Sequence, residues 1–133
     1  MKMIIGGAYQ GKLDYALNLT GYKKEDFLEG SSCDMEDIFS ARGIHGFHEY
    51  VKRYLEHSED WESFAKELFE RNPDLVVITN ELGYGVVPCD AADRRWREAT
   101  GRICTELAKH ARLVTRVVCG RGMVLKDETD SND

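Results

Sequence analysis

Cysteine is scarce in this sequence, and no long hydrophobic run occurs. The four cysteines among 133 residues are widely spaced and form no Cys-x-x-Cys pair, which disfavours a zinc site or a thioredoxin-like redox motif. They are Cys33, Cys89, Cys104 and Cys119, and we expect them to be reduced. No apolar run approaches the ~20 residues that a membrane-spanning helix needs. The first residues, Met-Lys-Met-Ile-Ile, are too few for a signal peptide, so we expect a cytoplasmic protein without a membrane span.

Basic residues are also fewer than acidic residues. The chain has 18 lysines and arginines against 24 aspartates and glutamates, which gives a net charge of -6 and an isoelectric point near 5.2. Binding to a nucleic-acid backbone needs clustered basic residues, so this balance disfavours a nucleic-acid partner. An anionic ligand such as a nucleotide would have to be bound by a local positive site.

The length predicts one domain with a sizeable core. A chain of 133 residues that is 42% hydrophobic and 32% charged is typical of a globular protein near the usual domain size. We predict a single domain over residues 1–126. Residues 127–133 are acidic and lack large apolar side chains, so we predict a disordered tail there.

The most informative segment is Gly6–Leu13, which reads Gly-Gly-Ala-Tyr-Gln-Gly-Lys-Leu. It fits the phosphate-loop pattern G-x-x-x-x-G-K-[ST] at every defined position except the last, where Leu13 replaces the hydroxyl residue. A short apolar run, Met3–Ile5, precedes it, and a helix can begin near Asp14. The sequence therefore places the motif at a strand-to-helix turn, where a phosphate loop belongs.

Each residue of such a loop has a physical task. Glycines let backbone N–H groups wrap a phosphate, the following helix directs its positive end at the anion, and Lys12 reaches the outer phosphates. Leu13 cannot ligate Mg²⁺ as the usual hydroxyl does. The predicted nucleotide-binding residues are Gly6, Gly7, Ala8, Tyr9, Gln10, Gly11, Lys12 and Leu13. The alternative is an ordinary glycine-rich turn with Lys12 in solvent.

The rest of the chain alternates between helix and strand patterns. Apolar residues at helical spacing predict helices over Phe47–Glu56, Trp61–Phe69 and Asp90–Ala111, and continuous apolar runs predict strands over Leu75–Ile78 and Val114–Cys119. Gly120–Gly122 reads as a tight turn before an edge strand, Met123–Lys126. We interpret Tyr22–Asp37 as a loop with one helical turn around Glu36–Phe39. These elements predict a three-layer α/β fold resembling P-loop NTPases, with a mostly parallel sheet and a C-terminal β-hairpin.

A second candidate segment follows the buried strand Leu75–Ile78. Ligands of open α/β sheets bind where the strands end, so we assign a substrate loop that contains Asn80, Glu81, Gly83, Gly85 and Pro88. Glu81 is a candidate Mg²⁺ ligand and proton acceptor. The alternative for Glu81 is a helix-cap or loop hydrogen bond.

Two histidines, His45 and His48, are further candidates. Their spacing would put both on one helical face only if a helix ran through Gly46, which glycine disfavours. A metal site made by two histidines alone is weakly supported, and surface or helix-end positions are the alternative. Arg42 could supply a cation beside them.

Four stretches resemble the bifunctional adenosylcobinamide kinase / adenosylcobinamide-phosphate guanylyltransferase (CobU) family. Residues 3–12 resemble its N-terminal strand and loop, and Val76–Pro88 resembles its Thr-Asn-Glu-Val-Gly-x-Gly-Ile-Val-Pro signature. Residues 97–108 and 117–122 resemble the helix and closing strand that follow. The chain reads as a short, divergent member.

The resemblance implies a nucleotide-binding enzyme of cobalamin synthesis. In that family GTP or ATP phosphorylates adenosylcobinamide, and GMP is then transferred through a covalent guanylyl-histidine, with oligomeric proteins the rule. Here Cys104 replaces an asparagine, and we find no counterpart of the histidine-bearing segment between Gly21 and Asp60. His45 and His48 are possible substitutes for that histidine.

Two hypotheses follow. The first is a homo-oligomeric enzyme in which Lys12 holds the outer phosphates of GTP or ATP, Glu81 organises Mg²⁺ or accepts the alcohol proton, and the kinase step is retained more readily than guanylyl transfer. The second is a catalytically impaired nucleotide- or corrinoid-binding module with a regulatory role. Leu13 and the divergent middle segment favour the second, whereas the ordered motifs favour the first.

Overall fold

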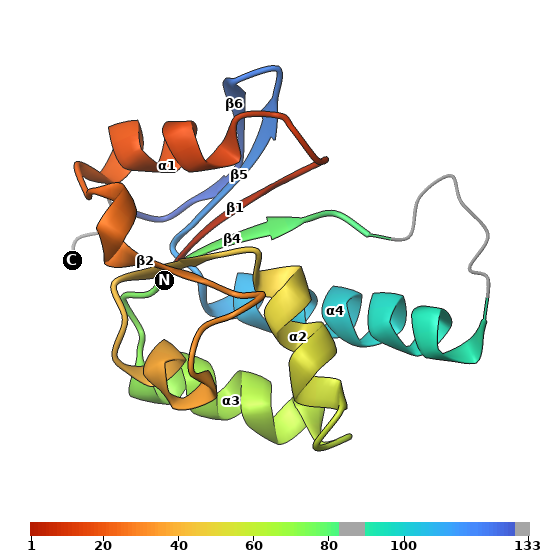
Figure 1. Ribbon diagram of the computed structural model, residues 1–133. Coiled ribbons are helices and arrows are strands. Elements are labelled where there is room, and N and C mark those ends of the chain that lie inside the picture. The colour runs from red at the N-terminus through yellow and green to blue at the C-terminus, as the bar shows by residue number, and fades with distance from the viewer. Residues whose placement is uncertain (83–89, 130–133) are drawn as a thin grey trace.

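The computed structural model describes residues 1–82 and 90–129 (Figure 1). The strands are β1 (Lys2–Gly6), β2 (Phe27–Glu29), β3 (Gly43–His45), β4 (Val76–Asn80), β5 (Leu113–Val118) and β6 (Arg121–Asp127). The α-helices are α1 (Lys12–Thr20), α2 (Phe47–Leu55), α3 (Trp61–Arg71) and α4 (Ala91–His110). Two short 3-10 helices, Lys24–Asp26 and Met35–Phe39, flank β2.

The strands form one six-stranded sheet in the order β2-β3-β4-β1-β5-β6. β1 pairs in parallel with β4 and with β5, and only β6 is antiparallel, in a hairpin with β5. Helix α1 lies on one face of the sheet and α2, α3 and α4 lie on the other (Figure 1). The predicted three-layer α/β architecture with a mostly parallel sheet and a C-terminal hairpin is therefore confirmed.

Alternation along the strands explains the layers. Successive side chains of a strand point to opposite faces, so Met3 and Val77 join the core beneath α2–α4, whereas Ile4 and Val76 join a smaller core beneath α1. All four side chains are at most 1% exposed. Burial on both faces is why β1 and β4 read as continuous apolar runs.

The middle segment differs from expectation. Tyr22–Asp37 was expected to be a loop with one helical turn around Glu36–Phe39. The turn is present as the 3-10 helix Met35–Phe39, but the segment also contains β2, and a further unpredicted strand, β3, begins at Gly43. Each has three residues, too few to give a periodic pattern. Gly43 allows the pairing with β2, because a Cβ there would lie 2.4 Å from the Phe27 ring.

The C-terminal hairpin is longer than predicted. β6 begins at Arg121, so the turn is made by Cys119 and Gly120, both with positive φ, and the prediction of a turn over Gly120–Gly122 is wrong at its second and third residues. The predicted tail, residues 127–133, begins inside β6. The backbone N–H of Glu128 still donates to the carbonyl of Arg112, at 2.7 Å, and residues 130–133 lie outside the described ranges.

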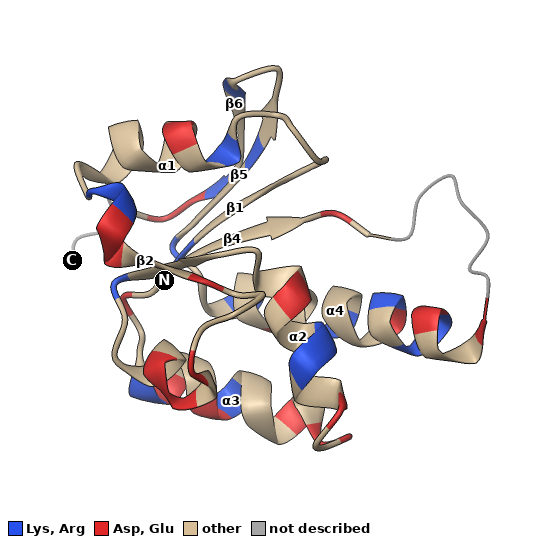
Figure 2. Cartoon of the chain, in the orientation of Figure 1, with Lys and Arg blue, Asp and Glu red and all other residues tan. Residues whose placement is uncertain are grey.

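Charged residues of both signs are interspersed along α3 and α4 (Figure 2). Several form ion pairs within one helix, as Arg97 does with Asp93 at 2.9 Å and Arg102 with Glu98 at 3.0 Å. None of the helices in residues 1–82 and 90–129 combines the length and the apolar character needed to cross a membrane.

Candidate phosphate site at the carboxyl edge of the sheet

The phosphate loop joins β1 to α1. Gly11 precedes the helix with φ +83°, a left-handed conformation that glycine adopts readily. Gly6 ends β1, and a Cβ there would lie 2.6 Å from the Val117 carbonyl oxygen, so no larger residue fits without backbone movement. Tyr9 also has positive φ, +60°, and its side chain is fully exposed at the tip of the loop. The loop therefore has two positions, Gly6 and Gly11, at which a side chain would meet crowding or an unfavourable backbone conformation.

The turn of the β5–β6 hairpin holds this loop in place. The backbone N–H of Gly120 donates to the Gln10 carbonyl at 2.8 Å, and the N–H of Cys119 donates to Gln10 Oε1 at 2.6 Å. A Cβ on Gly11 would lie 3.4 Å from the Gly120 Cα. The hairpin turn therefore positions the loop, a role that the Gly-x-Gly pattern alone did not reveal.

Lys12 lies beneath the loop and not in bulk solvent. It is only 9% exposed, its Nζ donates to the Gly7 carbonyl at 2.6 Å, and its methylene groups pass within 3.4 Å of where a Gly6 Cβ would be. Burial lowers the pKa of Lys12, and the negative charge of Glu81 opposes that shift. The alternative of an ordinary turn with a solvated lysine does not describe this arrangement.

Leu13 is half-buried. Its side chain packs against the apolar cluster formed by α1 with β1, β2, β4 and β5. Within residues 1–82 and 90–129, no three histidine, cysteine or carboxylate side chains gather where they could hold a metal ion. Glu81 as a Mg²⁺ ligand stays a prediction, because Mg²⁺ in nucleotide sites is held by one or two carboxylates together with water and phosphate oxygens.

Strand register brings the second candidate segment beside the loop. Asn80 pairs with Gly6, and Ile5 pairs with Arg116 on the other side of β1. The N–H of Glu81 donates to the Gly6 carbonyl at 2.9 Å, and Glu81 Oε2 lies 2.9 Å from Arg116 Nε. Arg116 was not predicted from the sequence. The signal that could have found it is its place at the end of a strand neighbouring β1.

His48 lies in the first turn of α2 and reaches the end of β4. Its Nδ1 accepts a hydrogen bond from the Asn80 N–H at 3.2 Å, and its Nε2 lies 3.8 Å from Glu49 Oε2. Burial lowers the pKa of His48, the nearby charge of Lys12 lowers it further, and Glu49 opposes both. A lowered pKa keeps the ring neutral, so it can act as an acceptor for Asn80.

His45 belongs to a different element. It ends β3, and Gly46, with φ +68°, separates that strand from α2, so the two histidines do not share a helical face. Arg42 precedes β3 and lies at the opposite, amino end of the sheet, where it packs 4.3 Å from the Tyr22 ring and 3.6 Å from Asp26. The idea that Arg42 supplies a cation beside the histidines is wrong, because parallel strands put it at the other edge.

Gly83, Gly85 and Pro88 of the predicted substrate loop lie outside the described residues, as does Cys89. Cys104, on α4, lies beside Thr79 of β4. Burial raises the pKa of the Cys104 thiol to about 12, and a hydrogen bond with the Thr79 hydroxyl opposes that shift. At that pKa the thiol stays protonated near neutral pH, which suits a packing role.

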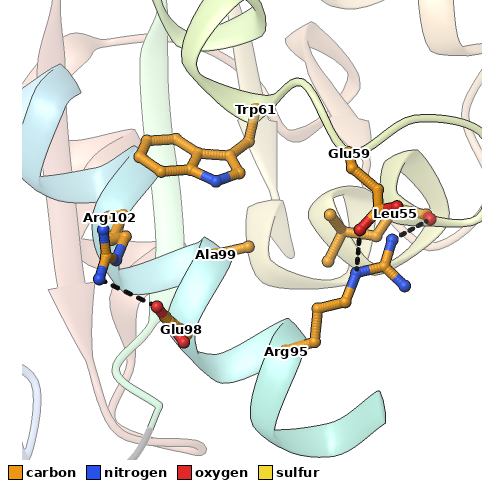
Figure 3. Close-up of a pocket in the computed structure, with 7 residues that line it drawn as sticks. All are labelled: Leu55, Glu59, Trp61, Arg95, Glu98, Ala99 and Arg102. Carbon is orange, nitrogen blue, oxygen red and sulfur yellow. Dashed lines mark hydrogen bonds and ion pairs between the residues drawn. The ribbon is translucent and has the colours of Figure 1, made fainter. Parts of the chain in front are cut away.

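A pocket of about 210 Å³ lies between α4 and the segment that joins α2 to α3 (Figure 3). Arg95 pairs there with Glu59 at 3.6 Å and donates to the Leu55 carbonyl at 2.8 Å, while Arg102 pairs with Glu98. Its residues are Leu55, Glu59, Trp61, Arg95, Glu98, Ala99 and Arg102. Its arginines are thus paired with carboxylates already, and none of its residues belongs to the phosphate site.

The fold and the loop together define an α/β domain with a phosphate-loop motif at the carboxyl edge of a parallel sheet. The sequence matches the family described as "Cobinamide kinase / cobinamide phosphate guanyltransferase" over residues 47–125, more than half of the chain. The chain belongs to this family.

Two curated relatives extend the comparison. A 52-residue segment is 40% identical to the bifunctional adenosylcobalamin biosynthesis protein CobU of Escherichia coli, and equally to that of Salmonella typhimurium. The segment is 39% of this chain and 29% of each relative, so the match spans less than a third of their length.

The matched range bears on two expectations. It begins at Phe47, so residues 47–60 lie within the family match and residues 21–46 lie before it, and the lack of a counterpart to the histidine-bearing segment stays a prediction. The phosphate loop lies before the matched range. Its assignment therefore depends on its own motif and on the contacts of Lys12 and Gln10.

Proposed function

We propose that this chain binds the phosphates of GTP or ATP at the loop Gly6–Leu13 and transfers the γ-phosphoryl group to adenosylcobinamide, a cytoplasmic step of cobalamin biosynthesis. The observation that carries the proposal is the burial of Lys12 beneath its own loop, with Glu81 and Arg116 at the adjoining strand ends. A buried lysine ammonium held at a helix N-terminus is the arrangement that phosphate loops use. Family membership supports the choice of acceptor.

The transfer step needs an alcohol and a γ-phosphate placed in line. The alcohol oxygen bonds to the γ-phosphorus while the bond to the β-phosphate oxygen breaks, and the nucleoside diphosphate leaves. Lys12 and the loop N–H groups would stabilise the outer phosphate oxygens, and Glu81 would accept the alcohol proton. We assign no step to Mg²⁺, because Leu13 offers no ligand and Glu81 is paired with Arg116.

The kinase step is the better supported of the family's two reactions. Guanylyl transfer through a histidine needs a ring nitrogen with a free lone pair. In His48, Nδ1 already accepts the Asn80 N–H, which leaves the proton of the neutral ring on Nε2. His45, on β3, stays a candidate for that reaction.

A second candidate function is a nucleotide- or corrinoid-binding regulatory module without transfer activity. The ion pair between Glu81 and Arg116 favours it, because a carboxylate held by a guanidinium is a weaker proton acceptor. Phosphate binding is common to both functions, so the first test addresses binding.

That test is isothermal titration of GTP and of ATP into the wild-type chain and the Lys12→Ala variant. We expect the variant to bind more weakly on the order of tenfold or more, because it loses a charge-assisted contact to the outer phosphates. Lys66→Ala, at an exposed position on α3, is the matched control for loss of one positive charge. Equal affinity of Lys12→Ala and Lys66→Ala would overturn the phosphate-site assignment.

We also propose that the chain forms a homo-oligomer. β6 is an edge strand, and Met123, Val124 and Leu125 on it are 53–56% exposed, so a second copy that pairs with this edge could cover apolar side chains on both faces of the strand. Sedimentation velocity at micromolar concentration should give a mass above 15.2 kDa. A monomer mass at that concentration would contradict the proposal.

A further inference from the structure

Three elements meet at His48. Its ring accepts the Asn80 N–H at the end of β4, and its backbone carbonyl accepts a hydrogen bond from Trp96 Nε1 of α4 at 2.7 Å. The imidazole also stacks near the Trp96 indole, with 6.4 Å between ring centroids, and its side chain is only 14% exposed. His48 thus ties the start of α2 to both β4 and α4.

The bond to Asn80 compensates for the end of the neighbouring strand. β3 pairs with β4 only through Gly43 and Ile44, and the chain then leaves the sheet at Gly46. No residue of β3 pairs with Asn80, and leaving its half-buried N–H without an acceptor would cost free energy. His48 Nδ1 supplies the missing acceptor.

The same peptide segment reaches the phosphate loop from its other side. Asn80 is in register with Gly6, and the N–H of the next residue, Glu81, donates to the Gly6 carbonyl at 2.9 Å. The Glu81 side chain then points to Arg116, its partner on β5. The position of Glu81 relative to the loop therefore depends on contacts on both sides of β4. Gly6 and Arg116 provide them on one side, and His48, through Asn80, provides one on the other.

We propose that His48 is a positioning residue that holds Asn80 and Glu81 against the phosphate loop, and that it is not the covalent acceptor of a nucleotidyl group. The expected effect of His48 on catalysis rests on the proposed function. Nδ1 of His48 accepts the Asn80 N–H, so the proton of the neutral ring lies on Nε2, whose nearest carboxylate oxygen, Glu49 Oε2, is 3.8 Å away. Positioning of Asn80 requires a hydrogen-bond acceptor at Nδ1 and does not require a nucleophilic nitrogen.

Two substitutions separate these roles. His48→Asn keeps an acceptor close to the place of Nδ1 but has no nucleophilic ring nitrogen, whereas His48→Leu has a similar size and no acceptor. His57→Asn, at an exposed position after α2, is the matched control for loss of a histidine. The full chain is used throughout, with GTP and adenosylcobinamide as the probes.

The first readout is steady-state kinetics of phosphoryl transfer. His48→Leu should lower kcat about tenfold or more with a smaller change in the KM for GTP, because Glu81 is displaced while Lys12 and its loop remain. His48→Asn should restore kcat to within about threefold of wild type. Equal losses in both variants, or covalent attachment of α-labelled GTP to His48, would overturn the proposal.

The second readout is hydrogen exchange of the Asn80 amide by NMR, which needs no substrate. The amide should exchange faster in His48→Leu and stay protected in His48→Asn and His57→Asn. Equal protection in all three variants would overturn the positioning role. If the wild-type chain binds no GTP, the proposed function fails on that result alone, and the Asn80 amide still decides whether His48 positions this segment.

Discussion

At the scale of single residues, the site combines positions that the sequence marks clearly with positions that only folding brings together. Lys12 was predictable because Gly6 and Gly11 place it in a recognisable pattern. Arg116 was not, because it is one charge in an otherwise apolar strand, and only the register of β5 with β1 places it beside Glu81. Motif spacing therefore identifies residues on one segment and misses partners on another.

Leu13 illustrates how one residue changes the chemistry of a loop. The helix position that usually carries a hydroxyl here contributes to the apolar core beneath α1. The loop keeps its lysine and its glycines while this side chain supplies packing. The proposed phosphate site therefore keeps its lysine but has no hydroxyl ligand for a metal ion at this position.

His48 gives a prediction for stability against pH. Its pKa in the folded chain is lowered from 6.5, mainly by burial, so the unfolded chain takes up a proton more readily. The contribution of His48 to the free energy of unfolding is full above pH 6.5 and is lost as the pH falls through its lowered folded pKa. Protonation would also remove the lone pair that accepts the Asn80 N–H.

Urea unfolding of the wild-type chain and of His48→Asn at a series of pH values checks this. The wild type should lose more stability than the variant over the range below pH 6.5, because only the wild type carries a neutral ring that must be protonated. Glu49 and Lys12, the charged neighbours of the ring, are the same in both proteins. Parallel pH profiles would show that His48 is protonated equally easily in the folded and unfolded chains.

At the scale of secondary-structure elements, length decided what could be predicted. The helices α2, α3 and α4 have nine or more residues with apolar positions at helical spacing, and all three were predicted close to their observed bounds. The strands β2 and β3 have three residues each, and their pairing depends on contacts such as Phe27 over Gly43. Such strands form because a neighbouring strand is present to pair with them, and the local sequence pattern does not reveal that pairing.

The hairpin of β5 and β6 shows the same limit in another form. The sequence predicted both strands and the turn between them, but not what the turn does. Its Cys119 and Gly120 N–H groups both bond to Gln10, more than a hundred residues earlier. An element at one end of the chain therefore supports the loop at the other.

At the scale of the whole molecule, the candidate site exists only at the carboxyl edge of the assembled sheet. β1 supplies the loop, β4 supplies Asn80 and Glu81, and β5 supplies Arg116 and the hairpin turn. Ligands of α/β sheets bind at this edge, which is why the fold could guide the choice of site before any contact was known. The family match over residues 47–125 covers α2, α3, β4, α4, β5 and most of β6, and it does not include β1, α1, β2, β3 or the two 3-10 helices.

The central claim is that this edge catalyses phosphoryl transfer that depends on Lys12. The measurement that tests it most directly is transfer of label from γ-labelled GTP to adenosylcobinamide, with Mg²⁺ in the buffer and Lys12→Ala beside the wild type. We predict labelled corrinoid with the wild-type chain and loss on the order of a hundredfold with the variant, in line with the removal of one preorganised charge at a transition state. Absence of labelled corrinoid with the wild type, while GTP still binds through Lys12, would contradict the claim and identify the chain as a binding module.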